Sequence, residues 1–256
     1  MLPGVAVAVS IAVALAAWRA KALTRTGALA AAAVGSLLLA GAGWPGAALL
    51  AAFFVPSTLV GRVGLGRLTG AEGREEIRSA RQVLANGAPA AAGGLAEFIA
   101  PGLGLWIAAA SLAAASADTW ATSLGRISAR DPILLGTGMR VPRGTSGAVS
   151  LPGTVAGLAG ATVVAGTAAT LLHQPALLWA GLGIGFGGML FDSALGAFAQ
   201  ARFVCPACLV SSERRRHHCG TPTRLARGWR WLDNDGVNAV TTTVAALAGA
   251  ILWVLQ

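Results

Sequence analysis

The chain has 256 residues, of which 55% are hydrophobic and only 11% charged, and its formal net charge is +9. Soluble domains average about 25% charged residues, so this composition excludes an ordinary soluble domain and indicates an integral membrane protein. A basic soluble protein would suggest a nucleic-acid partner. In a membrane protein, arginine-rich cytoplasmic loops account for the charge, and we expect no nucleic-acid partner. Three cysteines do not suggest a disulfide scaffold, but a metal site or reduced thiols.

The apolar stretches predict an all-α fold, a polytopic transmembrane helix bundle that forms one integral membrane domain over residues 1–256. A membrane span needs about 20 predominantly apolar residues. About eight spans are expected, with seven or nine as alternatives, near 2–18, 26–42, 44–60, 88–101, 102–121, 151–172, 176–197 and 237–255. The 88–101 stretch is short and contains Glu97 and adjacent glycines, which fits a tilted, broken or re-entrant helix.

The basic residues predict the orientation of the bundle. The first charges, Arg19 and Lys21, follow the first apolar stretch, which favours a retained span with the N-terminus outside. All 19 lysines and arginines then fall in the segments 19–25, 61–87, 122–150 and 198–236. Because positively charged loops stay in the cytoplasm, we expect these segments to be cytoplasmic and the protein to lie in the plasma or inner membrane.

Acidic residues near the cytoplasmic ends of the spans are the candidate catalytic groups. Asp118 follows an apolar helix, and Asp192 lies near the end of its span. A charge in an apolar segment costs several kcal/mol, so such residues are functional by default. Asp192 shares a helix face with Gly196 and Gln200.

A further acidic group opens the last span, with the residues Asp233, Asn234, Asp235 and Asn238. We expect Asp118, Asp192 and Asp235 to meet at one membrane surface and to hold Mg²⁺, which prefers hard oxygen ligands and bridges nucleotide phosphates. The alternatives are helix N-capping for Asp233 and Asp235, and an ordinary capping aspartate at Asp118.

Two arginines next to polar motifs are candidate phosphate ligands, because guanidinium groups bind phosphate in a bidentate manner. Arg81 precedes a motif with Gln82 and Asn86, and Arg143, a further catalytic candidate, precedes a second motif with Gly144, Thr145, Ser146 and Gly147. The chain's only lysine is Lys21, so no P-loop lysine is present. For most of the other arginines, the alternative interpretation is that their charge serves only to set the membrane topology.

Cysteine and histidine spacing in the 198–236 loop predicts a structural zinc site. Cys205 and Cys208 have the spacing of a zinc knuckle, and His217 and Cys219 complete a Cys₃His set. His217 is preferred to His218 as the ligand, because a spacing of two allows both side chains to turn inward. The alternative is a set of reduced or redox-active thiols.

These motifs together resemble one family. They are Arg81–Gly87, Ala117–Ala121, Val141–Gly147, Asp192–Gly196 with Gln200, Cys205-x-x-Cys208, His217-x-Cys219-Gly220 and Asp233–Asn238. The chain is similar, from about residue 75 onwards, to a family of bacterial and archaeal membrane proteins that includes plant phytyl-phosphate kinase. One position departs from the family pattern, because Ser123 stands where an acidic residue is usual.

The resemblance implies a membrane enzyme that transfers a nucleotide γ-phosphate to an isoprenyl monophosphate, with membrane lipid around it. More distant similarity to phytol and dolichol kinases and to CTP-dependent cytidylyltransferases suggests CTP as the donor. A transporter or flippase of an anionic or lipid-linked substrate is the first alternative, with Glu97 as its coupling residue. A membrane scaffold whose zinc loop docks a cytosolic partner is the second.

Overall fold

The protein is mostly helical, as predicted, in a computed structural model that describes residues 2–66, 77–213 and 215–256. The basic residues Arg67, Arg74 and Arg214 lie outside the described residues. The described helices are α1 (Pro3–Arg19), α2 (Arg25–Gly66), α3 (Ala80–Ala96), α4 (Leu103–Gly125), α5 (Leu151–Leu171), α6 (Pro175–Phe198) and α7 (Asn234–Val254).

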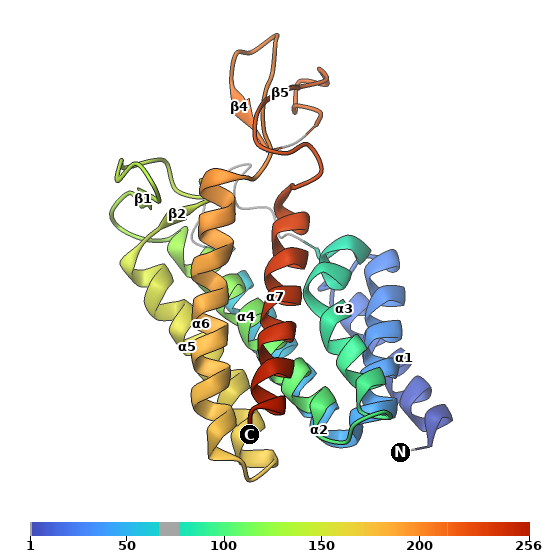
Figure 1. Cartoon of the computed structure of the whole chain (residues 1–256). Helices are drawn as coiled ribbons and strands as arrows, with labels where there is room; N and C mark the ends of the chain where they lie inside the picture. Colours follow the sequence, from blue (N-terminus) through green and yellow to red (C-terminus); the bar gives the residue numbers. More distant parts are fainter. Residues whose placement is uncertain (1, 67–76, 214) are drawn as a thin grey trace.

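Two small antiparallel sheets lie in loops at one end of the bundle (Figure 1). In the first, β1 (Ile133–Leu134) pairs with β2 (Ala148–Val149). In the second, β3 (Arg202–Val204) lies between β4 (Ser211–Ser212) and β5 (Arg224–Arg227). The sequence predicts both regions simply as loops, because strands of 2–4 residues are too short to give a periodic pattern.

Four of the described helices are long and apolar enough to cross a membrane: Arg25–Arg62, Leu151–Leu171, Pro175–Phe198 and Asn234–Val254. The helix α1 is apolar but shorter. These four are fewer than the eight spans expected from the sequence, partly because α2 is counted as one helix.

Helix α2 is broken at Gly43, where φ is 60° and ψ is −150°. Its two arms fold against each other, since a Cβ built on Gly35 would lie 3.8 Å from Cδ2 of Leu50. In a straight helix these residues would be about 22 Å apart. A positive φ is available to glycine at little cost, so Gly43 permits the reversal. The predicted boundary between 26–42 and 44–60 therefore coincides with a real turn in the chain.

Helix α3 starts earlier than predicted, at Ala80, so the motif from Arg81 to Gly87 forms its first turns and is not part of a loop. The cause is a capping box: the Ser79 side chain accepts from the Gln82 backbone N–H, and the Gln82 side chain accepts from the Ser79 backbone N–H. Helix α4 continues to Gly125, beyond the predicted end at 121, so Asp118 lies nearly two turns before the end of the helix.

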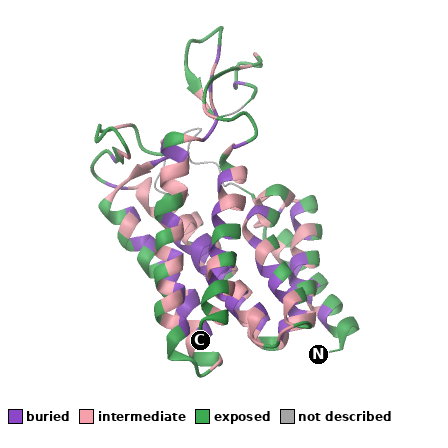
Figure 2. Ribbon diagram, in the orientation of Figure 1, coloured by how far each residue is buried: buried purple, intermediate pink, exposed green. Residues whose placement is uncertain are grey.

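Helix α4 is the centre of the bundle, and every residue from Ala108 to Ala117 is buried. Figure 2 shows the buried residues concentrated where the helices face one another. The surrounding helices approach α4 through glycines, which allow close backbone contact in membrane bundles. The glycines in contact are Gly93 of α3, Gly157 and Gly160 of α5, Gly185 and Gly188 of α6, and Gly249 of α7.

Glu97 caps the start of α4. Its carboxylate accepts hydrogen bonds from the backbone N–H groups of Gly102, at 2.7 Å, and Leu105, at 3.2 Å. A negative charge at a helix N-terminus satisfies free N–H groups and is favoured by the helix dipole. The sequence left the role of Glu97 open, and the structure gives it a structural one.

The four basic segments meet at one end of the bundle, whereas both termini lie at the other end (Figure 1). Arg62 donates to the carbonyl of Ala20, and Leu23 bridges to Arg78. The pair Arg81–Asp233 and the contact of Arg202 with Ser146 join the remaining segments. This arrangement supports the sequence-based assignment of all these segments to one side of the membrane.

Gly185 and Gly187 provide a test of this packing, since they lie on opposite faces of α6. A Cβ at Gly185 would come within 3.0 Å of Cβ of Ala113, whereas one at Gly187 would meet nothing within 4 Å. We expect Gly185→Leu to lower the free energy of unfolding by about 1–3 kcal/mol through overpacking. Gly187→Leu should leave it nearly unchanged. Thermal unfolding in detergent measures both, and equal losses would contradict the packing.

Candidate functional site

Asp118 of α4 and Asp192 of α6 meet at the end of the bundle that carries the basic loops. Their carboxyl groups lie within hydrogen-bonding distance of each other. Thr241 of α7 donates from Oγ1 to Oδ2 of Asp192, at 3.1 Å. Three helices that are distant along the chain thus bring their polar side chains to one point.

Glycine packing sets the spacing of this acidic pair. A Cβ built on Gly188 would lie 2.8 Å from Cβ of Ala114. Both residues stand one turn before the aspartates, Gly188 before Asp192 and Ala114 before Asp118. The close approach of α4 and α6 therefore forces the two carboxyl groups together.

The acidic pair lines a pocket that is open to solvent and has about 850 Å³ of empty space, its mouth included. The predicted glycine-rich motif forms a wall of this pocket, with Gly144, Thr145, Ser146 and Gly147 all among the lining residues. Gln200, which is buried, also lines it and donates from Nε2 to Oγ of Ser146 at 3.1 Å. Asp192 and Gln200 therefore both line the pocket, but α6 ends at Phe198, so the predicted helix face does not extend to Gln200.

Two side chains from the 198–236 loop hold the glycine-rich wall in place. Arg202 donates to the backbone carbonyl of Ser146 at 2.7 Å, and Ser146 donates from Oγ to Glu213 at 2.6 Å. Burial lowers the pKa of Arg202 from its ordinary value, and the neighbouring Arg227 lowers it further. The sequence gave no role to either Arg202 or Glu213.

The cation in the pocket is Arg126, which sequence analysis did not select. It lines the pocket, and it is close enough to Asp118 for its charge to act on that carboxylate. Arg143, the predicted catalytic arginine, is not among the lining residues and instead contacts Asp131, at 3.8 Å, and the carbonyl of Ala129. Helical spacing was an available signal, because Arg126 lies two turns after Asp118 on the same face.

Arg81, the second predicted phosphate ligand, is engaged by acidic residues at the start of α7. Two of its guanidinium nitrogens each donate to a carboxylate oxygen of Asp233 at 2.6 Å, and its Nε lies 3.6 Å from Asp235. Asp233 is also the N-cap of α7 and accepts from the N–H of Gly236, which confirms its alternative interpretation.

The remaining predicted polar residues lie around the pocket's edge or away from it. Asn234 lines the pocket, whereas Gln82, Asn86 and Asn238 are not among its lining residues. Gln82 and Asn86 bond within α3, where Asn86 donates to the carbonyl of Gln82 at 2.9 Å. These three are therefore placed by helix structure and not by the pocket.

The structure brings together two of the three predicted magnesium ligands. Asp118 and Asp192 are paired, but Asp235 lies beside Arg81, and these three carboxylates do not form one converging cluster. Two carboxylates this close repel each other unless a proton or a cation lies between them. The pair fits Mg²⁺, which proteins usually hold with one or two carboxylates plus phosphate oxygens. Ser123 is not among the pocket-lining residues, so an acidic residue is not missing from this wall.

A separate cluster of Cys205, Cys208, His217 and Cys219 lies in the outermost loop. One ligand atom from each residue lies within 4.8 Å of all the others. The hydrogen bonds of Cys219 with Thr221 and His217 lower its pKa to about 5, whereas the bond with Cys219 raises the pKa of Cys208 to about 11. The ring of His218 packs against that of His217 at a tilt of 49°, but His218 is not part of the cluster.

Gly147 and Gly138 provide a test of how the pocket wall is docked, since both lie in the 126–150 loop with positive φ, 80° and 68°. A Cβ at Gly147 would collide with the backbone of Ala197, whereas one at Gly138 would meet nothing within 4 Å. We therefore expect alanine at either site to cost about 1–2 kcal/mol of backbone strain, and only Gly147→Ala to release the loop from α6.

Limited trypsin digestion at Arg140 and Arg143 would measure this release, with cleavage expected to be several-fold faster in Gly147→Ala than in Gly138→Ala. Equal rates in the two variants would show that the wall does not depend on contact with α6.

Comparison with known proteins identifies a family and relatives that match most of the chain. The sequence profile described as "Integral membrane protein DUF92" matches residues 8–246. An uncharacterised membrane protein of Methanocaldococcus jannaschii is 27% identical over 235 residues, which cover 92% of this chain and 87% of the relative. A second uncharacterised membrane protein, from Synechocystis, is 32% identical over 223 residues, or 83% of this chain and 76% of the relative.

A plant protein gives a partial match. Protein PGR of Arabidopsis thaliana is 30% identical over 154 residues, which cover 54% of this chain and 51% of that protein. No solved structure matches the chain.

Proposed function

The chain belongs to the integral membrane protein DUF92 family, and on this premise we propose that it is a membrane-embedded kinase of isoprenyl monophosphates. It transfers the γ-phosphate of a nucleoside triphosphate, with CTP as the first candidate donor, to the phosphate of a phytyl-type lipid. The observation that carries the proposal is the pocket in which Asp118, Asp192 and Arg126 face a glycine-rich loop at one end of an apolar bundle.

The topology of the proposed enzyme has eight crossings with the N-terminus outside the cell. The two arms of α2 count as separate crossings, which together with the other six helices gives this number. Both termini then lie on the outer side, and the basic loops lie on the cytoplasmic side of the plasma membrane. The pocket opens at the cytoplasmic surface, where nucleotides are available.

The acidic pair is the metal-binding part of the site. Asp118 and Asp192 would hold Mg²⁺, which would supply positive charge to neutralise the charge that develops in phosphoryl transfer. Thr241 fixes the orientation of Asp192 through its hydrogen bond. Asp235 has no place in this metal site, because it lies beside Arg81.

Arg126 and the glycine-rich wall bind the phosphate groups. Arg126 lies beside the acidic pair and stabilises charge on the transferred phosphoryl group. Residues 144–147 line the pocket, and a glycine-rich backbone of this kind is suited to binding phosphate oxygens. No lysine-containing P-loop is needed for this arrangement.

The reaction needs no strong general base. An oxygen of the acceptor monophosphate attacks the γ-phosphorus of the donor, a new P–O bond forms, and the bond to the β-phosphate oxygen breaks. The products are the isoprenyl diphosphate and the nucleoside diphosphate. The lipid phosphate is already ionised, so no residue has to remove a proton from it, and the chain's contribution is positioning and charge.

The first test measures label transfer from γ-labelled CTP or ATP to phytyl or farnesyl monophosphate by the purified protein with Mg²⁺. We expect Asp118→Asn and Asp192→Asn to reduce the rate by at least about a hundredfold, because each removes charge that the metal requires. Glu97→Gln should keep most of the activity, since glutamine retains a side-chain oxygen that can accept the hydrogen bond from the backbone N–H of Gly102 at the start of α4.

The outcome also separates the kinase from a transporter. In a transporter with Glu97 as coupling residue, Glu97→Gln would stop function and the aspartate variants would not affect a chemical step. If the wild-type protein transfers label to no lipid phosphate with any of the donors, the proposed kinase function is overturned.

A second prediction concerns the cation. We expect Arg126→Ala to lower the rate by about a hundred- to a thousandfold, in the range found when one charge-stabilising donor is removed. Arg143→Ala should have a small effect, because Arg143 contacts Asp131 outside the pocket. The same transfer assay compares them, and the reverse order would restore the sequence-based assignment to Arg143.

A further inference from the structure

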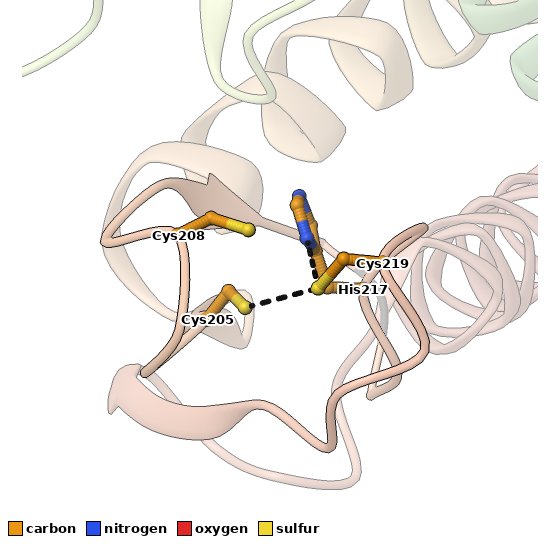
Figure 3. A group of neighbouring side chains, drawn as sticks. All are labelled: Cys205, Cys208, His217 and Cys219. Carbon is orange, nitrogen blue, oxygen red and sulfur yellow. Dashed lines mark hydrogen bonds between the residues drawn. The ribbon is translucent and has the colours of Figure 1, made fainter.

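We propose that Cys205, Cys208, His217 and Cys219 bind a structural Zn²⁺, and that this metal orders the loop that holds the wall of the pocket. Figure 3 shows the four side chains converging from two loops, with Cys205 and Cys208 on one and His217 and Cys219 on the other. The site goes beyond the proposed kinase and does not depend on it.

The distances fit a tetrahedral zinc site. Sγ of Cys205 lies 3.6 Å from Sγ of Cys219, and Nδ1 of His217 lies 3.1 Å from the same sulfur. With Zn–S bonds of about 2.3 Å, a tetrahedron places two sulfurs about 3.8 Å apart. A disulfide would require about 2.05 Å. Three thiols and one imidazole also form a closed ligand set, which is typical of structural and not catalytic zinc.

The backbone presents the ligands from two tight turns. In the first turn, the backbone carbonyl of Cys205 accepts a hydrogen bond from the N–H of Leu209 at 2.9 Å, and its backbone N–H donates to the carbonyl of Val210 at 3.0 Å. In the second turn, the backbone carbonyl of His217 accepts a hydrogen bond from the N–H of Gly220 at 2.9 Å, and its backbone N–H donates to the carbonyl of Thr221 at 3.0 Å. In each turn, the backbone of the first ligand of the pair makes both hydrogen bonds. The two ligand pairs therefore face each other from similar turns.

The loop has little else to stabilise it. In the sheet of β3, β4 and β5, Phe203 is the buried apolar side chain, and all four residues of β5 are exposed. Arg202 stands opposite Arg227 across β3 and β5, and like charges opposite each other destabilise a strand pair. Small units without a sufficient core usually need a metal or a disulfide. A zinc ion supplies that link here.

The same loop touches the pocket. Arg202, at the start of β3, and Glu213, directly after β4, both hydrogen-bond to Ser146 of the glycine-rich wall. Cys205 directly follows β3, and His217 follows Glu213 by four residues. Zinc binding therefore fixes the segments from which the pocket wall is held.

The first experiment measures zinc by elemental mass spectrometry of the protein purified in detergent. We expect about one zinc per chain in the wild type, a large loss in His217→Ala, and wild-type content in the matched control His218→Ala, whose ring packs on His217 outside the ligand cluster. No zinc in the wild type, or equal content in both variants, would overturn the site.

A second measurement does not depend on the folding of a variant. The wild-type protein is stripped with a chelator and reloaded with Co²⁺, which should give the visible absorption of tetrahedral cobalt with thiolate ligands. Hydrogen exchange in residues 144–147 and 202–213 should rise on stripping and fall on reloading. Unchanged exchange would remove the link to the pocket wall, while octahedral cobalt spectra would remove the ligand set. Neither result depends on phosphoryl transfer.

Discussion

The close packing of small residues around α4 determines the arrangement of the other helices and of the acidic pair. Helices in a membrane gain little from burying apolar side chains against each other, because lipid is apolar as well, and van der Waals contact has to hold them. Glycines on α3, α5, α6 and α7 permit that contact. The contact of Gly188 with Ala114 lies one turn from Asp192 and Asp118. Structural packing and site geometry are therefore set by the same interaction.

The pocket has a rigid base and a less tightly held wall. Its base carries Asp118 and Asp192, which belong to buried, closely packed helices. The wall is a loop that packs against α6 at Gly147 and is otherwise held through Ser146, which contacts Gln200, Arg202 and Glu213. Exposed polar pairs contribute about 0–1 kcal/mol each, and segments with few buried contacts open first. Such a division would suit the proposed kinase, whose site would have to admit a nucleotide and then enclose its phosphates.

The sequence predicts the apolar helices, the turn near Gly43 and the convergence of the basic segments, because hydropathy and charge act over whole segments. It also predicts that Asp118 and Asp192 lie on one side of the bundle. It does not predict which cation accompanies them, because proximity to a polar motif does not determine where a side chain points. Arg81 and Arg143 lie beside such motifs but contact Asp233 and Asp131. Similarly, the start of α3 depends on a local cap at Ser79, which a hydropathy profile does not detect.

Charge balance limits what the pocket can bind. Among the residues that the structure describes, its lining includes the acidic side chains Asp118, Asp192 and Glu213 and the arginine Arg126, which together carry a formal net charge of −2 when all are ionised. In the proposed kinase, a free polyphosphate would be repelled by the acidic pair, since like charges at the partly buried base of the pocket interact strongly. A divalent cation held by the pair would offset this repulsion, so the proposed nucleotide would be expected to enter as its metal complex. Arg126 would then be available for phosphate oxygens.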